Sequence, residues 1–183
     1  LAPSSYQELQ QMFEDAMALT DGPVAIRWSK TPAPHVGWDE VGRGLAARRL
    51  RAGDGQVCLL GAGKMLAAAQ DAADELAAEG IDATVWDPRC IRPLDEEMLA
   101  DAARHRLVVT IEDGFREGGF GTGVLDALAA RSHQNEMPGV SVLGVPVAHH
   151  AHGSADALLA SFGLDGPGVA STVRSRLGTA TQE

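Results

Sequence analysis

Acidic side chains stand where a buried strand is expected to end. Leu107 to Ile111 is an apolar run rich in β-branched residues, and Glu112 and Asp113 follow it directly. Because ligands of open α/β sheets gather at the carboxyl ends of the strands, this pair is placed for acid/base chemistry. The alternative is a hydrogen-bonding role at an interface between domains, and the residues alone do not separate the two.

Two glycine-containing segments suggest nucleotide or phosphate chemistry. Gly61-Ala62-Gly63 follows a predicted strand and Asp87 ends the next one, which is the arrangement of a dinucleotide site. Leu66 stands in the place of the third glycine, so a plain strand-to-helix turn is favoured. Gly118 to Gly121, at a predicted helix start, could cradle a phosphate through backbone N–H groups. It lacks the Lys and Ser/Thr of a P-loop, so close backbone packing is the preferred interpretation.

Three histidines lie close together in His149-His150-Ala151-His152. A zinc site needs three or four ligands with compatible geometry, and adjacent side chains point apart in most backbones. A structural or surface role is therefore favoured over a metal cluster. One of these histidines could still point into an active site built together with another domain.

Two cations near the start of the chain could bind an anion. Lys30 directly follows a predicted strand, Pro23 to Trp28, and Arg27 lies three residues earlier. A cation at a seam between two domains can hold a substrate phosphate as a point charge. From the residues alone, a solvated surface lysine is the simpler interpretation.

The elements that must position these residues alternate between strand and helix. After a first helix capped by Ser4 or Ser5, buried strands are predicted at residues 56–60, 83–86, 107–111 and 140–145. Helices are predicted at residues 65–80, from Asp95, at about 121–130, from Ser154 to Phe162, and at 167–177. This alternation predicts an α/β fold with a doubly wound, mostly parallel sheet and helices on both faces.

Composition excludes several classes of partner. The net charge of −10 argues against a nucleic-acid or anionic-membrane surface, since such surfaces need clustered Lys and Arg. No apolar run approaches the length of a membrane span, and no signal peptide is visible. The two cysteines, Cys58 and Cys90, form no disulfide framework, which favours a reducing compartment and a cytoplasmic protein. The chain opens at Leu1 on a helix-capping pattern, which is most simply a start inside an existing fold.

Four segments follow, in order and in register, the pattern of one enzyme family. They are Gly22 to Lys30, Asp87 to Asp95, Val109 to Gly121, and His152-Gly153-Ser154 with Phe162 to Asp165. Any one of them is a weak signal, whereas four over this length are specific. The chain resembles the C-terminal domain of the transketolase-like, thiamine-diphosphate-dependent enzymes, and most closely the 1-deoxy-D-xylulose-5-phosphate synthases.

The resemblance implies a domain organisation. Residues 1–30 would be the end of a pyrimidine-binding domain, too short to fold alone. Residues 31–55, with Pro32, Pro34 and a basic patch, would be an interdomain linker. Residues 56–178 would be the transketolase-like C-terminal domain, followed by a tail at 179–183.

The resemblance also implies a reaction. Members of this family condense pyruvate with glyceraldehyde 3-phosphate, release carbon dioxide, and feed isoprenoid, thiamine and pyridoxal synthesis. It implies thiamine diphosphate and Mg²⁺ as cofactors of the complete enzyme, which is a homodimer. The further partners would be the diphosphate- and pyrimidine-binding domains that are missing here, on the same or a separate chain.

The family pattern places a substrate-phosphate site at Lys30 and Arg27. The residue that matches Lys30 is proposed to hold the phosphate of the aldehyde substrate, and a lysine in place of the commoner arginine makes this contact a single point charge. Ser29 and Thr31 replace the usual proline and glycine, so this loop differs in shape from the family pattern. Gly114 stands where an asparagine is frequent.

The chain is not expected to act alone. Gly53-Asp54-Gly55 resembles the start of the metal-diphosphate motif of thiamine enzymes, but Asn135, the single asparagine, is too distant to complete it, so a turn is predicted. The glutamate that activates the aminopyrimidine would lie in the missing part of the pyrimidine domain. We therefore expect no catalytic, cofactor-binding or metal-binding residue here, and an isolated chain that is inactive. Its role would be dimer contacts and the floor of the substrate entrance near Lys30.

Other interpretations stay open. Within the class, the chain could be the C-terminal part of a 2-oxoacid dehydrogenase β subunit or of a transketolase. From other classes, it could be a stand-alone nucleotide- or ligand-binding α/β module, or a pure oligomerisation domain. The Gly22 to Lys30 loop discriminates within the class, because a dehydrogenase acting on pyruvate alone needs no phosphate-binding cation there.

Overall fold

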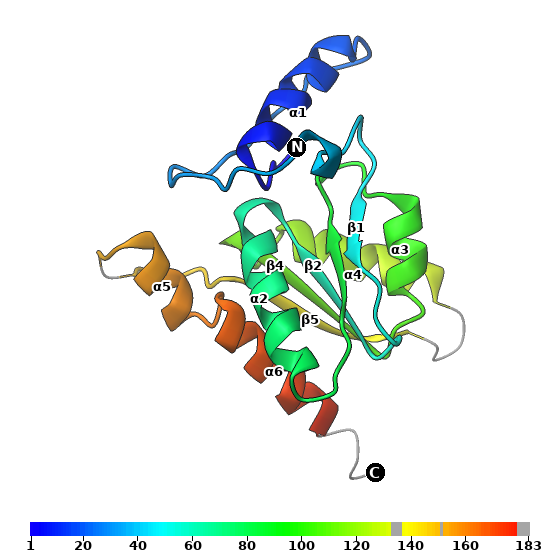
Figure 1. Cartoon of the computed structure of the whole chain (residues 1–183), viewed down its shortest axis with the longest axis vertical. Helices are drawn as coiled ribbons and strands as arrows, with labels where there is room; N and C mark the ends of the chain where they lie inside the picture. The colour runs from blue at the N-terminus through cyan, green and yellow to red at the C-terminus, as the bar shows by residue number, and fades with distance from the viewer. Residues whose placement is uncertain (133–136, 151, 179–183) are drawn as a thin grey trace.

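One helix stands apart from a sheet domain in the structure, a computed structural model that describes residues 1–132, 137–150 and 152–178 (Figure 1). Helix α1 (Tyr6–Ala18) lies beyond one end of the sheet, while helix α6 (Gly166–Gly178) runs toward the other. The predicted tail at 179–183 and Asn135 lie outside the described residues. Within the described part of the chain, no helix combines the length and the apolar character needed to cross a membrane.

A five-stranded sheet forms the centre of the molecule, in the order β1-β3-β2-β4-β5. Its strands are β1 (Arg48–Arg51), β2 (Val57–Gly61), β3 (Thr84–Asp87), β4 (Leu107–Phe115) and β5 (Gly139–Val145). The pairs among β2, β3, β4 and β5 are parallel, and only β1 runs antiparallel, against β3. The doubly wound, mostly parallel sheet is therefore confirmed.

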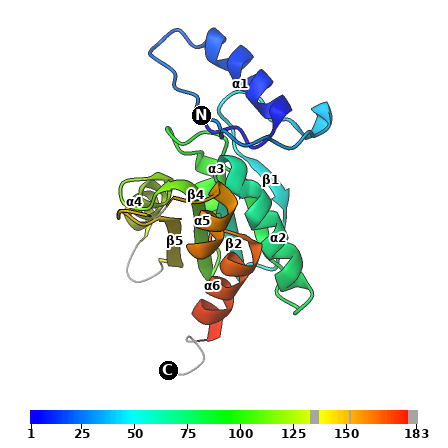
Figure 2. The same ribbon diagram turned by 90° about the vertical axis from the view of Figure 1, so that its left-hand side faces the viewer.

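Helices cover both faces of this sheet, as predicted. Helices α2 (Leu66–Ala77) and α6 lie side by side on one face (Figure 2), while α3 (Glu96–Ala102) and α4 (Phe120–Arg131) cover the other. The buried strand β2 shows how this works, because Val57 and Leu59 join the first core and Cys58 and Leu60 join the second. Side chains alternate along a strand, so a strand buried on both faces must be apolar throughout.

Short elements complete the chain. They are the 3₁₀ turns η1 (Trp38–Glu40) and η2 (Gly63–Met65) and helix α5 (Ala155–Ser161). Three predicted helix caps are confirmed, since the side chains of Ser5, Asp95 and Ser154 each accept a hydrogen bond from the backbone N–H three residues later.

The predicted strand from Pro23 to Trp28 is wrong. The segment is extended, but it joins no sheet, and its described backbone pairing is limited to Leu1, which donates to Ala25 at 2.7 Å and accepts from Arg27 at 2.9 Å. A strand needs a neighbour along its length, and a single residue does not supply one.

Strand β1 was not expected, because it lies inside the predicted 31–55 linker. Arg48, Arg49 and Arg51 pair with β3 and so give the sheet a charged edge. Edge strands rich in charge resist pairing with other chains. The run of arginines that reads as a basic patch in the sequence is therefore an edge strand in the structure.

Candidate functional site

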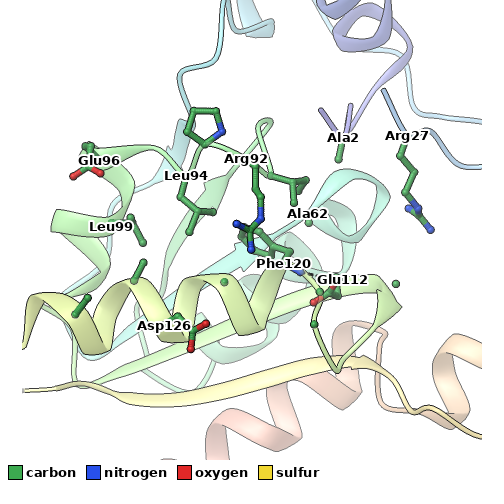
Figure 3. Close-up of a pocket in the computed structure, with 18 of the residues that line it drawn as sticks. Ala2, Arg27, Ala62, Arg92, Leu94, Glu96, Leu99, Glu112, Phe120 and Asp126 are labelled. Carbon is green, nitrogen blue, oxygen red and sulfur yellow. Dashed lines mark hydrogen bonds between the residues drawn. The ribbon is translucent and has the colours of Figure 1, made fainter. Parts of the chain in front are cut away.

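A cavity of about 660 Å³ opens at the carboxyl edge of the sheet (Figure 3). Part of its wall comes from segments that follow β2 and β3, at Ala62 and at Ile91 to Leu94, and from the last part of β4, at Glu112 to Gly114. Helices α3 and α4 line it as well, and Ala2 and Arg27 reach it from the N-terminal segment. Its position and size are those of ligand sites in α/β proteins.

Glu112, at the back of this cavity, is a helix cap. It is 7% exposed, and its two carboxylate oxygens accept the backbone N–H groups of Phe120 at 3.0 Å and Gly121 at 2.9 Å. Gly119, the residue before α4, has no side chain to do this. Burial raises the pKa of Glu112, and the two N–H groups oppose that shift. Glu112 is therefore committed to holding the start of α4 in place.

The phosphate-cradle interpretation of Gly118 to Gly121 is wrong for the same reason, because Glu112 already occupies the amides. The preferred interpretation, close backbone packing, is confirmed. A Cβ atom on Gly119 would lie 2.2 Å from Glu112 Oε2, and one on Gly121 would lie 2.3 Å from Thr110 Oγ1. These glycines let the first turn of α4 press against β4.

Of the two predicted phosphate-binding residues, Arg27 lines the cavity and Lys30 does not. Arg27 lines the rim of the cavity, where its Nη1 donates to Asp113 Oδ1 at 2.6 Å, with 61% of the arginine side chain exposed. Lys30 is exposed and lines neither this cavity nor a second one of about 180 Å³ beside the Trp28 to Pro34 loop. The acid/base pair is also divided, since Asp113 pairs with Arg27 while Glu112 caps α4.

Asp87 is not available to a ribose, so the dinucleotide interpretation fails here. The residue is fully buried, and its carboxylate accepts a hydrogen bond from Ser4 Oγ at 2.6 Å and from the backbone N–H of Arg89 at 3.0 Å. Burial, reinforced by the charge of Glu8, raises the pKa of Asp87 to about 7 against these two hydrogen bonds. Asp87 thus fastens the N-terminal segment to the end of β3.

Sequence reasoning missed the partner of this carboxylate, Arg89. It is 1% exposed, has a φ of 55°, and donates through Nε to Glu8 at 2.9 Å. Its Nη1 donates to three backbone carbonyls, those of Arg43, Gly44 and Ala46. Glu8 also accepts the N–H of Gly42 at 2.7 Å. Ser4, Glu8, Asp87 and Arg89, which we call the Asp87 cluster, join α1 to the sheet domain. The available signal was an arginine two residues after Asp87, directly before the apolar pair Cys90-Ile91.

The described residues do not form a metal centre. No three His, Cys, Asp or Glu side chains in the described part of the chain are grouped to hold an ion. His150 contacts the ring of Phe162 and the carbonyl of Pro146, and Ala151 lies outside the described residues. Asp54 forms the predicted turn by accepting the N–H of Gln56 at 2.9 Å. The residues present therefore do not fit the Mg²⁺-diphosphate group of a thiamine enzyme.

Both cysteines are buried and unreactive by position. Cys58 lies in the second core, Cys90 follows Arg89, and burial raises the pKa of both thiols. A thiol held protonated is a poor nucleophile, so neither residue offers covalent chemistry.

The chain is similar to members of one known family over most of its length. The family described as "Transketolase, C-terminal domain" matches residues 45–169. The chain is 39% identical over 184 residues to a 1-deoxy-D-xylulose-5-phosphate synthase of Anaeromyxobacter dehalogenans, and 34% identical over 185 residues to one of Magnetococcus marinus. Each match covers 97% of this chain and 29% of the relative, so the chain spans less than a third of the length of these relatives.

Solved structures show the same fold. One titled "Split gene transketolase, inactive beta4 tetramer" superposes with a TM-score of 0.84 at 30% identity, over 95% of this chain and 56% of that one. A transketolase from Pichia stipitis has a TM-score of 0.68 at 17% identity, over 99% of this chain and 25% of that one. The second likeness concerns the fold alone.

Proposed function

Because the chain belongs to the transketolase C-terminal domain family, we propose that it is the C-terminal part of a 1-deoxy-D-xylulose-5-phosphate synthase. The complete enzyme would use thiamine diphosphate and Mg²⁺ to join pyruvate and glyceraldehyde 3-phosphate with loss of carbon dioxide. The observation that carries this proposal is the similarity to synthases over 97% of the chain, at 34–39% identity.

The cofactor would be held elsewhere in the enzyme. Thiamine diphosphate supplies the carbanion stabilisation that a decarboxylating condensation needs. The residues described here do not fit that group, because Asp54 is used in a turn and no metal-binding cluster is formed within the described ranges. The diphosphate-binding domain and the rest of the pyrimidine-binding domain would therefore be the partners of this chain, in a homodimer.

The contribution of this chain would be to bind substrate. Lys30 is exposed, so its ammonium group is accessible to a phosphate from outside the domain. Arg27 already pairs with Asp113, so it would act as a second, weaker cation at the same entrance. The Asp87 cluster supports this role, since it fixes α1, and with it the segment that carries both cations, to the sheet domain.

The test is steady-state kinetics of the complete enzyme with Lys30→Ala. Loss of a charged contact to phosphate costs about 1.5–3 kcal/mol, so we expect KM for glyceraldehyde 3-phosphate to rise about 10- to 100-fold with little change for pyruvate. Lys30→Arg keeps the charge and should preserve KM, and Arg48→Ala, which removes a charge from the edge strand, should leave both KM values unchanged. An equal rise for both substrates would remove Lys30 from the phosphate site.

A transketolase subunit is the second candidate, favoured by the 30% identity and TM-score of 0.84 to the split-gene transketolase. Release of carbon dioxide from pyruvate by the complete enzyme separates the two, because only the synthase reaction decarboxylates its donor. That solved protein is titled inactive, in line with our proposal that this chain alone has no activity. Turnover by the isolated 183 residues would contradict the proposal.

A further inference from the structure

Arg92 is an exposed cation of the large cavity, with no partner for its side chain among the described residues. It follows β3 in the loop Ile91 to Leu94, and its side chain extends into the cavity toward Phe120 (Figure 3). Within the described ranges of the chain, its guanidinium makes no hydrogen bond or ion pair. An arginine that enters a cavity without a partner keeps all its donors for a ligand.

Most of the other charges that line this cavity are already neutralised. Arg27 pairs with Asp113, and Arg131 pairs with Glu96. The carboxylate of Glu112 is bound by two backbone N–H groups. Asp126 is exposed, and in Figure 3 its carboxylate lies across the α4 ribbon from Arg92. Arg92 is therefore the cation of the cavity whose guanidinium is left for an anion, while the charge of Asp126 lies on the other side of α4.

Much of the remaining wall is apolar. Leu99, Phe120 and Ala62 are at most 6% exposed and line the cavity from α3, α4 and the turn after β2. Leu94 and Ala127 are partly buried on the same wall. Binding of a hydrocarbon or aromatic group against such a wall is favourable by about 25 cal/mol for each Å² of apolar surface removed from water.

We infer that this cavity binds a small molecule that carries one phosphate or carboxylate on an apolar body. Arg92 holds the anion in a forked contact, and the wall formed by Leu94, Leu99 and Phe120 covers the body. Lys30 does not line this cavity, whereas Arg27, the second cation of the proposed substrate entrance, lies on its rim and is paired with Asp113. The proposed anion contact at Arg92 uses neither of these two cations, so it can be tested independently of the proposed substrate site.

Calorimetric titration of the complete protein with 1-naphthyl phosphate tests the inference. Every variant carries Lys30→Ala and Arg27→Gln, so that neither cation of the proposed substrate site contributes. We expect saturable binding that Arg92→Gln weakens at least about tenfold, equivalent to about 1.4 kcal/mol. Arg48→Gln is the matched control, since Arg48 lies on the edge strand outside the cavity and should leave the affinity unchanged. 1-Naphthol and inorganic phosphate should each bind more weakly than the combined molecule.

A second variant places a side chain inside the cavity. Gly123 lines the cavity from α4, and a Cβ atom placed there meets nothing within 4 Å. Gly123→Leu should abolish binding while the thermal stability is kept or raised, because glycine inside a helix costs about 1 kcal/mol. Equal affinity for Arg92→Gln and Arg48→Gln would overturn the inference. So would unchanged binding to Gly123→Leu, no binding to the parent protein, or equal binding of inorganic phosphate and 1-naphthyl phosphate.

Discussion

Asp87 and Glu112 are two buried acids at the carboxyl ends of β3 and β4, the strands on either side of β2. Burial raises the pKa of both. Glu112 acts locally, because its partners Phe120 and Gly121 are eight and nine residues away. Asp87 acts over a long range, because its partner Ser4 is 83 residues away. The two acids therefore have different roles although they occupy equivalent positions in the sheet. Glu112 caps the start of α4, and Asp87 attaches the N-terminal segment to the sheet domain.

The donors differ as well, which makes the two sites respond differently to change. Glu112 faces two backbone N–H groups that can only donate. Asp87 faces one backbone N–H and the hydroxyl of Ser4, which can donate or accept. A neutral amide can therefore replace the carboxylate at position 87 but not at position 112.

The largest effect is expected where the long-range attachment depends on buried charge. Glu8→Ala removes the carboxylate that accepts from Arg89 Nε and leaves only Asp15, whose Oδ2 is 3.9 Å from Nη2, while Glu8 and Arg89 are each 1% exposed. Breaking a buried ion pair costs about 3–5 kcal/mol, so the free energy of unfolding from chemical denaturation should fall by that amount. Glu14→Ala, on the exposed side of α1, is the control and should stay within about 0.5 kcal/mol of the parent. Similar losses for both variants would mean that the Asp87 cluster does not anchor α1.

The pH dependence of stability should separate the two acids next. Folding raises the pKa of Asp87 from its ordinary 3.8 to about 7, so the folded protein binds the proton more tightly than the unfolded chain. The stabilisation from this group is complete below about pH 4 and is lost as the pH rises to about 7. It amounts to a few kcal/mol, since each tenfold gain in proton affinity corresponds to about 1.4 kcal/mol.

Denaturation curves of Asp87→Asn between pH 4 and 8 check this expectation. The amide should remove that fall in stability, and at pH 5 it should cost less than about 1 kcal/mol, because the Ser4 hydroxyl can turn to accept. A variant that keeps the pH dependence of the parent would show that Asp87 is not its source.

A smaller effect is expected at the local site. Glu112→Gln presents an NH₂ group to one of two backbone donors, so one buried N–H loses its acceptor. We expect a loss of about 1–3 kcal/mol in the free energy of unfolding at pH 5. The first turn of α4 should then exchange its amide hydrogens faster, which NMR or mass spectrometry can follow. Equal losses of stability for Glu112→Gln and Asp87→Asn at pH 5 would contradict the proposed difference between backbone N–H groups, which can only donate, and the Ser4 hydroxyl, which can also accept.

Much of the sheet domain could be predicted from the sequence, because its signals are local. The apolar run Leu107 to Ile111, the turn at Gly61 to Gly63 and the caps at Asp95 and Ser154 each depend on residues close in the chain. The Pro23 to Trp28 segment has the same local signal for a strand, but a strand also needs a neighbour, which the described residues do not supply along its length. Strand β1 shows the opposite error, because a strand was present where the sequence predicted a linker. Its arginines are suited to the edge of a sheet, and that position is known only once the sheet has formed.

The sequence by itself determined the fold class and the family, because periodicity and motif spacing are properties of the chain. The phosphate site that it predicts at Arg27 and Lys30 stays a prediction. The tertiary structure decided what the acids do. Glu112 became a cap, Asp113 a partner of Arg27, and Asp87 an anchor for Ser4, since each role depends on a group brought close only by folding. It also decided that Arg92 enters a cavity with no partner among the described residues. Burial and pairing set the charge state and the free donors of a side chain, and neither can be read from its neighbours in the sequence.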